Sequence, residues 1–192
     1  SETVQRLLAD IQKNGREAVE KYARDLDGWH GKIVVSEDDF ANASKRLSRG
    51  VLDDLAFAHA RVRDFAQRQR ESLHEFEVEL IDGLVAGQKL IPVNTAGCYV
   101  PGGRYAHAAS AIMSVCTAKV AGVPNVVATS PGHREAGVNP AILHTMKLCG
   151  ADTVLALGGV QGIAAMAFGL YSAKPADVIV GPGNRFVAEA KR

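Results

Sequence analysis

The sequence TVLALGGVQGIAAMAF, residues 153–168, carries the strongest structural signal in this chain. A short apolar run leads into the pair Gly158-Gly159, and a second apolar run without any charged residue follows it. This order is typical of a buried strand, a tight glycine turn and the first turns of a buried helix. Because such a turn has free backbone N–H groups and no side-chain bulk, a ligand can lie against the main chain there.

The same arrangement occurs twice more in the chain. Residues 98–103 run from Cys-Tyr-Val into Pro-Gly-Gly, and residues 178–184 run from Val-Ile-Val into Gly-Pro-Gly-Asn. Ligands of open parallel sheets bind beyond the carboxyl ends of the strands. We therefore expect the three glycine turns to converge on one ligand crevice.

Residues 96–192 predict an α/β domain with a parallel sheet. Strand-like runs recur around Tyr99, Val127, Leu155 and Ile179, at separations of 28, 28 and 24 residues. The helical stretches between them cover about residues 106–121, 139–149 and 160–170. Units of this length predict parallel strands joined by right-handed crossovers. The unbroken apolar runs predict strands that are buried on both faces.

Residues 1–95 predict a different architecture, a helical arm closed by a small antiparallel hairpin. The expected elements are helices over 2–26, 37–48 and 50–72, a short strand over 32–35, and paired strands over 76–80 and 84–93. Asn14-Gly15 breaks the first helical pattern, and Asp82-Gly83 is the hairpin turn. We therefore divide the chain into an arm, residues 1–95, and an α/β domain, residues 96–192.

The composition limits the function classes. Hydrophobic residues make up 47% and charged residues 22%, which is ordinary for a globular protein and argues against disorder. The formal net charge of +1 gives no general attraction to nucleic acid or to an anionic membrane, and no apolar run is long enough to span a bilayer.

Cys98, Cys116 and Cys149 lack zinc spacing and lie in apolar stretches. They predict reduced thiols in a cytoplasmic protein, in preference to a nucleophilic role for Cys98.

Two standard nucleotide-binding motifs do not occur in the chain. It contains neither the ordered G-x-G-x-x-G fingerprint nor a Walker A lysine. The arginines of residues 61–70 raise the possibility of nucleic-acid binding, but acidic residues share the same helix, which is typical of a solvated face. No histidine pair has metal-ligand spacing, so the sequence predicts no metal site within these residues.

Each glycine turn carries a polar side chain that can contact a ligand. Tyr99 has a ring and a hydroxyl, and Gln161 and Asn184 lie at expected helix N-termini, where backbone N–H groups favour phosphate. The alternatives are a core position for Tyr99 and simple helix caps for the other two. Arg104 and His107 follow the first turn and suit an anionic group of a substrate, although a solvent-facing loop is the alternative there.

The segments GCYVPGGRY, KVAGVPNVV, LGGVQGIAAMAFG and VGPGNRFVAEAKR resemble the histidinol dehydrogenase family, and the likeness covers essentially the whole chain. The resemblance implies an NAD-linked, zinc-dependent enzyme that oxidises a primary alcohol through an aldehyde to a carboxylate. It implies an incomplete Rossmann-like fold and an intertwined homodimer. It also implies that Tyr99, Gln161 and Asn184 contact NAD, whereas the zinc ligands and catalytic residues have no counterpart in residues 1–192.

The run that follows the first turn points to a subgroup. Arg104 and His107 lie in RYAHAAS, which is similar to family members acting on sulfonated diols, the sulfopropanediol dehydrogenases. Our hypothesis is oxidation of 2,3-dihydroxypropanesulfonate, with Arg104 or His107 near the anionic end. The alternatives are L-histidinol oxidation and a catalytically silent nucleotide-binding or dimerisation fragment. Residues 185–192 begin a helix with no terminating signal, which predicts a fragment of a longer chain.

Overall fold

A computed structural model describes residues 1–192 except 103–105, 135 and 172–173. The helices before the sheet are α1 (Glu2–Asp27), α2 (Glu37–Lys45) and α3 (Arg49–Glu71). The strands are β1 (Phe76–Ile81), β2 (Leu84–Gln88), β3 (Thr95–Tyr99), β4 (Asn125–Ser130), β5 (Thr153–Ala156) and β6 (Val178–Val180). The remaining helices are α4 (Ala108–Ala111), α5 (Thr117–Val120), α6 (Pro140–Leu148), α7 (Gly159–Ala167) and α8 (Arg185–Ala190).

The central sheet has four parallel strands in the order β5-β4-β3-β6, as the strand and helix alternation predicts. The carboxyl ends of these strands lie at one edge of the sheet, because Tyr99 pairs with Thr129 and Ser130 pairs with Ala156. The three glycine turns follow strands of this sheet and therefore leave from the same edge.

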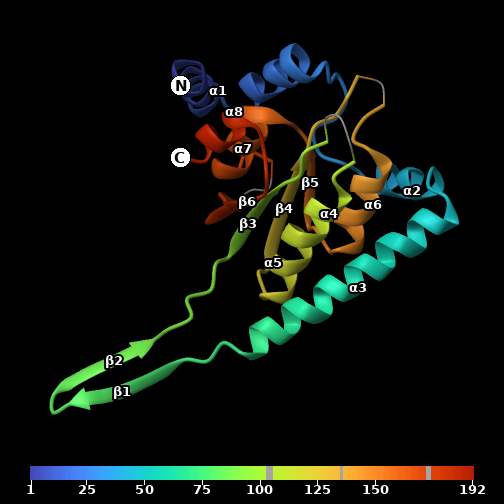
Figure 1. The fold of residues 1–192 in the computed structure, drawn as a ribbon. Helices are drawn as coiled ribbons and strands as arrows, with labels where there is room; N and C mark the ends of the chain where they lie inside the picture. The colour runs from blue at the N-terminus through green and yellow to red at the C-terminus, as the bar shows by residue number, and fades with distance from the viewer. Residues whose placement is uncertain (103–105, 135, 172–173) are drawn as a thin grey trace.

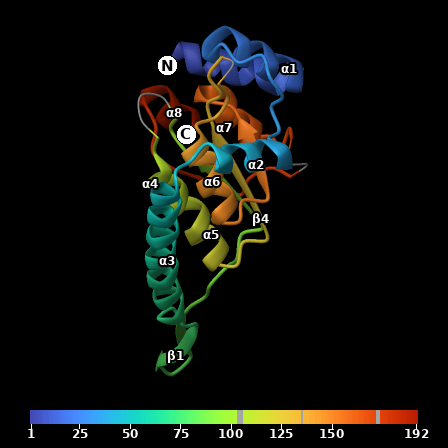
Figure 2. The same ribbon diagram turned by 90° about the vertical axis from the view of Figure 1, so that its right-hand side faces the viewer.

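Helices cover both faces of the sheet (Figure 1). Cys98, Ala128 and Val154 point into a core with α4 and α6, whereas the alternate residues Tyr99, Val127 and Leu155 point into a second core. Figure 2 shows α1 and α7 packed together at the far end of the molecule from the hairpin. Ile11, Ala18 and Val19 of α1 belong to the second core with Ile163 and Met166 of α7.

Local signals set the helix ends. Ser36 and Asp39 form a capping box at the start of α2, and Asn139 caps α6 with Pro140 at its start. Gly15 interrupts α1 with non-helical dihedral angles, as predicted for Asn14-Gly15. The helix predicted over 106–121 is observed as α4 and α5 joined by a π-helical turn over Ile112–Cys116. Periodicity cannot reveal such a widened turn, because it changes the hydrogen-bond ladder and hardly changes the apolar face.

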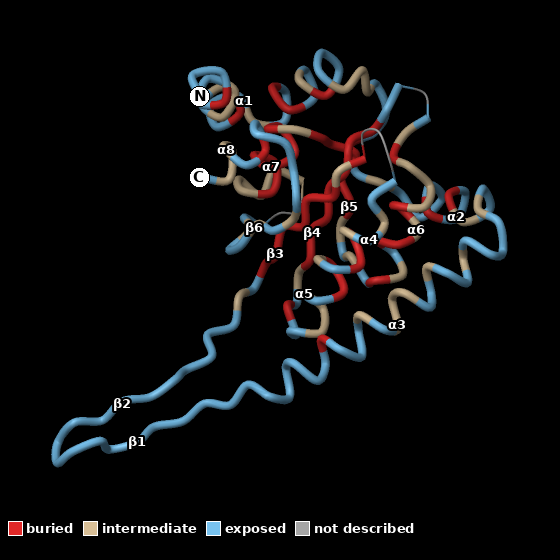
Figure 3. The backbone as a smooth tube through the Cα atoms, in the orientation of Figure 1, coloured by how far each residue is buried: buried red, intermediate tan, exposed pale blue. Residues whose placement is uncertain are grey.

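The arm differs from the expectation at two places. The strand predicted over 32–35 is reduced to a single antiparallel bridge between Val34 and Leu155. The second hairpin strand was predicted to reach Val93, but β2 ends at Gln88, before the proline at position 92. Every residue of β1 and β2 is exposed, whereas every residue of β3 is buried (Figure 3). None of the helices that the structure describes is long and apolar enough to cross a membrane.

Candidate functional site

A hydrogen-bonded cluster joins three separate elements at the carboxyl edge of the sheet. Tyr99 ends β3 and is 5% exposed, and its hydroxyl accepts a hydrogen bond from Gly159 N at 3.1 Å. Burial raises the pKa of Tyr99, and the hydrogen bond from Gly159 N opposes that shift in part. Tyr99 therefore reaches from β3 to the start of α7, where a neutral phenol can accept one hydrogen bond and donate another.

Gln161 lies in the first turn of α7 and is 1% exposed. Its Nε2 donates to Asp27 Oδ2 at 2.9 Å, so the side chain does not cap its own helix. Its Oε1 is one of two buried side-chain nitrogen or oxygen atoms in the described part of the chain that have no hydrogen-bond partner. A buried polar atom of this kind requires an explanation, and a bound ligand is one.

Asp27 is a candidate site residue that the sequence analysis missed, because it lies just after the helix predicted over residues 2–26. That helix end is observed, since Gly28 ends α1 in the left-handed conformation. The carboxylate, however, turns toward α7 and accepts hydrogen bonds from Gly158 N at 3.0 Å and from Gln161. A signal was available, because an acidic residue at a helix C-terminus opposes the helix dipole.

The surroundings of Asp27 are only partly accessible to water. Burial raises the pKa of the Asp27 carboxyl, whereas the hydrogen bonds from Gly158 N and Gln161, and the nearby His133, act in the opposite direction. A hollow of about 590 Å³ lies beside the carboxylate and is lined by Asp27, His133, Arg134 and Ala136. The cluster therefore borders a space large enough for part of a small-molecule ligand.

Bare main chain at the turn after β5 makes close approach possible. Gly159 has a φ of +52°, and a Cβ atom added there would lie 3.0 Å from Gln161 Oε1. The glycine is required for its backbone conformation, and it also leaves open the position next to the unpaired oxygen.

Ser130 supplies the second unpaired atom at this edge and was also missed. It ends β4, is 0% exposed, and its Oγ has no hydrogen-bond partner among the described residues. The turn after β3 lies against it, because a Cβ on Gly102 would be 2.7 Å from Ser130 Oγ. His133 is exposed, but its Nε2 donates to Gly102 O at 2.9 Å and so connects the loop after β4 to the first glycine turn.

Asn184 lies at the same edge and outside the hydrogen-bonded cluster. It follows β6, the neighbour of β3, and its side-chain oxygen caps α8 by accepting from Phe186 N and Val187 N at 3.0 and 3.1 Å. The helix-cap alternative is thus observed for Asn184, while Gln161 has a different environment. Because the side-chain oxygen of Asn184 is engaged in the cap, a ligand would contact this side chain through its amide nitrogen.

Of the two candidate substrate residues the structure describes only His107, which does not join the cluster. Arg104 lies outside the described residues. His107 is exposed immediately before α4, and its backbone carbonyl accepts from Ser110 N. The geometry therefore carries no argument for either residue as a substrate contact.

The described residues offer neither a group of side chains for a metal ion nor a reactive thiol at Cys98. Within residues 1–102, 106–134, 136–171 and 174–192, no group of three or more His, Cys, Asp or Glu side chains could hold a metal ion. Cys98 is buried, and burial raises the pKa of its thiol to about 11. Such a thiol carries almost no thiolate at neutral pH and is a poor nucleophile.

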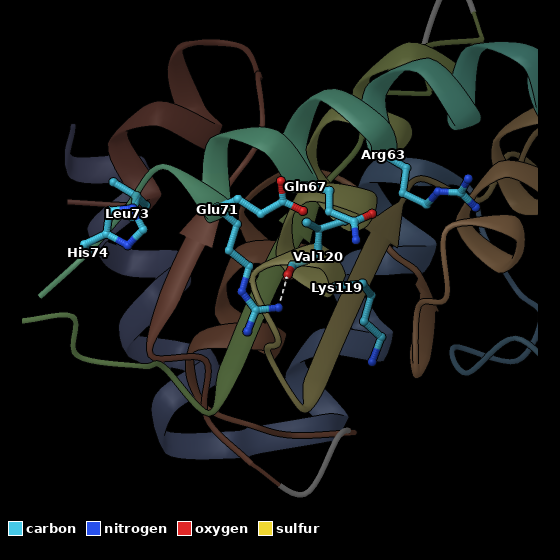
Figure 4. A pocket seen from close by; sticks show the side chains of 8 residues that line it. Arg63, Gln67, Glu71, Leu73, His74, Lys119 and Val120 are labelled. Carbon is cyan, nitrogen blue, oxygen red and sulfur yellow. Dashed lines mark hydrogen bonds between the residues drawn. The ribbon is translucent and has the colours of Figure 1, made fainter.

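A second hollow, of about 610 Å³, lies at the opposite edge of the sheet (Figure 4). Arg63, Arg70 and Lys119 make it basic. Arg70 donates to Val120 O at 2.7 Å, and Lys119 pairs at 2.7 Å with Asp152, the residue that precedes β5. These cations are already engaged in the fold, and the amino-terminal edge of a parallel sheet is not where ligands bind. Arg61 and Arg63 form ion pairs with Asp64, and Arg68 forms one with Glu71, as expected of a solvated face.

The fold and the strand-end cluster together define an α/β domain with a candidate ligand site at the carboxyl edge of a parallel sheet. Comparison with known proteins then identifies the family. The family model described as histidinol dehydrogenase matches residues 1–192, and the chain belongs to the histidinol dehydrogenase family.

Three curated relatives and one solved structure illustrate the match. A histidinol dehydrogenase homolog of Ruegeria pomeroyi is 55% identical over the whole chain, and a sulfopropanediol 3-dehydrogenase of the same organism is 50% identical, also over the whole chain. A histidinol dehydrogenase of Methanococcus maripaludis is 40% identical over 99% of the chain. The crystal structure of histidinol dehydrogenase from Elizabethkingia anophelis matches 99% of the chain with a TM-score of 0.89 and 29% identity. The chain spans 44% of the first two relatives and of that structure, and 45% of the Methanococcus protein.

Proposed function

We propose that this chain supplies the dinucleotide-binding part of an NAD-dependent dehydrogenase that oxidises a small polar primary alcohol through an aldehyde to a carboxylate. The observation that carries the proposal is the buried cluster of Tyr99, Gly159, Gln161 and Asp27 at the strand ends, in which Gln161 Oε1 is left unpaired. Membership of the histidinol dehydrogenase family supports the same activity.

The residues at this edge fit a dinucleotide. Tyr99 has a hydroxyl and a ring, Gln161 an acceptor oxygen, Asn184 an amide nitrogen, and the half-buried Gly159 a position without a side chain. When bound, NAD accepts the hydride that leaves the alcohol carbon. The contribution of these residues is to bind and orient the dinucleotide, and the surrounding buried strand ends limit the access of water.

Zinc does not fit the described residues, since they contain no group of side chains that could hold a metal ion. We assign the zinc ligands and the catalytic residues of the proposed enzyme to sequence beyond residues 1–192, because the relatives are more than twice as long as the matched region. The role left to the strand-end cluster is therefore binding and not metal-assisted chemistry.

For the substrate we propose a sulfonated diol such as 2,3-dihydroxypropanesulfonate. The identity of 50% to a sulfopropanediol 3-dehydrogenase, against 40% to a histidinol dehydrogenase of Methanococcus maripaludis, favours this choice. L-Histidinol is the second candidate, supported by the likeness to the solved histidinol dehydrogenase. Arg104 and His107 remain the proposed contacts to the anionic end of the diol.

Turnover by the full-length protein tests the proposal. NADH formation is followed at 340 nm with 2,3-dihydroxypropanesulfonate and with L-histidinol, each with added zinc and after treatment with a chelator. We expect a higher kcat/KM for the sulfonated diol. Preference for histidinol would refute the sulfonate assignment and keep the dehydrogenase. Absence of saturable NAD binding would refute the dinucleotide site itself.

We also propose that the protein is a cytoplasmic homodimer. All three cysteines are free and buried, which suits a reducing compartment. The hairpin carries exposed apolar side chains, among them Phe76, Leu80 and Val85, and an isolated two-stranded hairpin is marginally stable in water. A partner surface would stabilise it. The mass of the protein in solution, measured by light scattering, tests the dimer.

A further inference from the structure

Asp27 and Gln161 form a side-chain pair that leaves one acceptor atom unused. Asp27 Oδ2 accepts hydrogen bonds from Gln161 Nε2 at 2.9 Å and from Gly158 N at 3.0 Å. Gln161 Oε1 is buried and has no hydrogen-bond partner in the part of the chain that the structure describes. A buried acceptor without a partner destabilises the fold, so an oxygen held in this way indicates that it binds a ligand.

The chemistry of the pair fixes the orientation of the amide. A side-chain amide has a donor end and an acceptor end, and an ionised carboxylate only accepts. Oδ2 of Asp27 already faces a second donor, Gly158 N, so it acts as the acceptor in this pair. Rotating the Gln161 amide by 180° would place two acceptor oxygens against each other. Asp27 therefore binds the nitrogen of Gln161 and makes Oε1 the atom that remains for a ligand.

The position beside that oxygen is open. Gly159 is half-buried, and an added Cβ would lie 3.0 Å from Gln161 Oε1, which is a hydrogen-bond distance. A ligand atom can take the place that a side chain would fill. The backbone N–H of Gly159 is directed elsewhere, because it donates to the hydroxyl of Tyr99.

We propose that Asp27 is a positioning residue, which holds the Gln161 amide so that Oε1 accepts a hydrogen bond from a donor group of the bound dinucleotide. This inference rests on the proposed function, since it takes the dinucleotide as the ligand. A ribose hydroxyl and the carboxamide N–H₂ are donors of this kind, whereas a diphosphate at neutral pH only accepts. Gln161 thus recognises a hydroxyl or amide of the cofactor, and the phosphates lie elsewhere along the sheet edge.

A double-mutant cycle separates action through Gln161 from an independent effect. The dissociation constant of NAD is measured by calorimetry for the full-length protein and for Asp27→Ala, Gln161→Ala and the double variant. We expect each single variant to weaken NAD about tenfold, the scale of one lost hydrogen bond, and the double variant to be no weaker than Gln161→Ala. A double variant weakened by the product of the two single effects would overturn the proposal.

The conservative variant Asp27→Asn tests whether the acceptor atom matters. Its side-chain oxygen can still accept from Gly158 N and from Gln161 Nε2, so we expect an NAD affinity within about twofold of the wild type. An affinity as low as that of Asp27→Ala would overturn the proposal, because the orienting contact would then be irrelevant. Asp25→Ala, which removes an exposed carboxylate from the same turn of α1, serves as the matched control and is expected to bind NAD normally.

An exchange of groups between the two positions tests the orientation of the pair. Gln161→Glu places two carboxylates together and is expected to weaken NAD by at least about tenfold. In Asp27→Asn/Gln161→Glu the asparagine oxygen still has to accept from Gly158 N, so it also faces the new carboxylate, and NAD affinity is expected to stay low. Recovery of NAD affinity in the double variant would overturn the proposal, because the asparagine would then donate to residue 161 and Gly158 N would not fix the acceptor.

ADP-ribose distinguishes the possible donors, because it lacks the carboxamide. Weaker ADP-ribose binding by Gln161→Ala assigns the contact to a ribose hydroxyl or to the adenine amino group, and unchanged binding assigns it to the carboxamide; both support a donor.

The failures of the two proposals are also distinguishable. If the wild type does not bind NAD, the proposed function fails and the inference fails with it. If the wild type binds NAD and both alanine variants bind equally well while remaining folded by circular dichroism, the inference alone fails.

Discussion

Strand β3 and the hairpin β1–β2 are neighbours in the sequence but differ completely in burial. The residues of β3 are all buried, and those of β1 and β2 are all exposed, although only six residues separate Gln88 from Thr95. β3 pairs with a strand on each side and has helices on both faces, whereas the hairpin strands pair only with each other. Strand character alone therefore does not determine burial; the number of packed neighbours does.

Thiol reactivity is expected to give the largest contrast between the two regions. Cys98 lies within β3, is 0% exposed, and has a pKa raised to about 11 by burial. A Leu80→Cys variant places a thiol in the hairpin, where Leu80 is 60% exposed. At pH 8 we expect a thiol reagent to modify the introduced cysteine about 10⁴-fold faster or more, because Cys98 reacts only after local opening.

The measurement is mass spectrometry of the protein after timed alkylation, with the wild type as the control for the native cysteines. In dilute solution, where the protein is monomeric, protection of the cysteine introduced by Leu80→Cys would contradict this contrast. Protection that develops only at higher protein concentration is the result expected of the proposed homodimer, in which a partner surface covers the hairpin.

Loss of apolar volume is expected to give a contrast of several kcal/mol. Leu155→Ala removes a fully buried side chain from β5, and the free energy of unfolding is expected to fall by about 2–5 kcal/mol. Leu80→Ala in the hairpin is the matched change and is expected to stay within about 0.5 kcal/mol of the wild type. Urea denaturation followed by circular dichroism measures both values. Equal losses would show that the hairpin is as tightly packed as the sheet.

Glycine substitution is expected to give the smallest contrast. Gly181 and Gly83 both have positive φ, +117° and +76°, so alanine is strained at either position. At Gly83 nothing lies within 4 Å of the added Cβ, and the expected loss is about 1 kcal/mol. At Gly181 the Cβ would overlap the carbonyl oxygen of Tyr99, which adds about 1–3 kcal/mol and disturbs the site. Parallel urea titrations compare the two variants, and similar losses would contradict the close approach of β6 to Tyr99.

The sequence predicted the positions of the four parallel strands, the helices between them and the hairpin turn, because these depend on apolar runs and glycines that are close together in the chain. It also singled out Tyr99 and Gln161, since each follows or ends a strand of the sheet. The expected strand over residues 32–35 was wrong, because a short apolar run does not specify how many partners it finds.

Asp27 could not be found by the same reasoning. It is 134 residues away from Gln161 in the chain, and their contact exists only because α1 packs on α7. Apolar periodicity predicts that two helices each have a face to bury; it does not specify which polar side chains meet at the rim of the buried face. The sequence by itself determined the elements and the bare glycine turns. Only the tertiary structure decided which carboxylate holds Gln161, because that hydrogen bond depends on packing between distant segments.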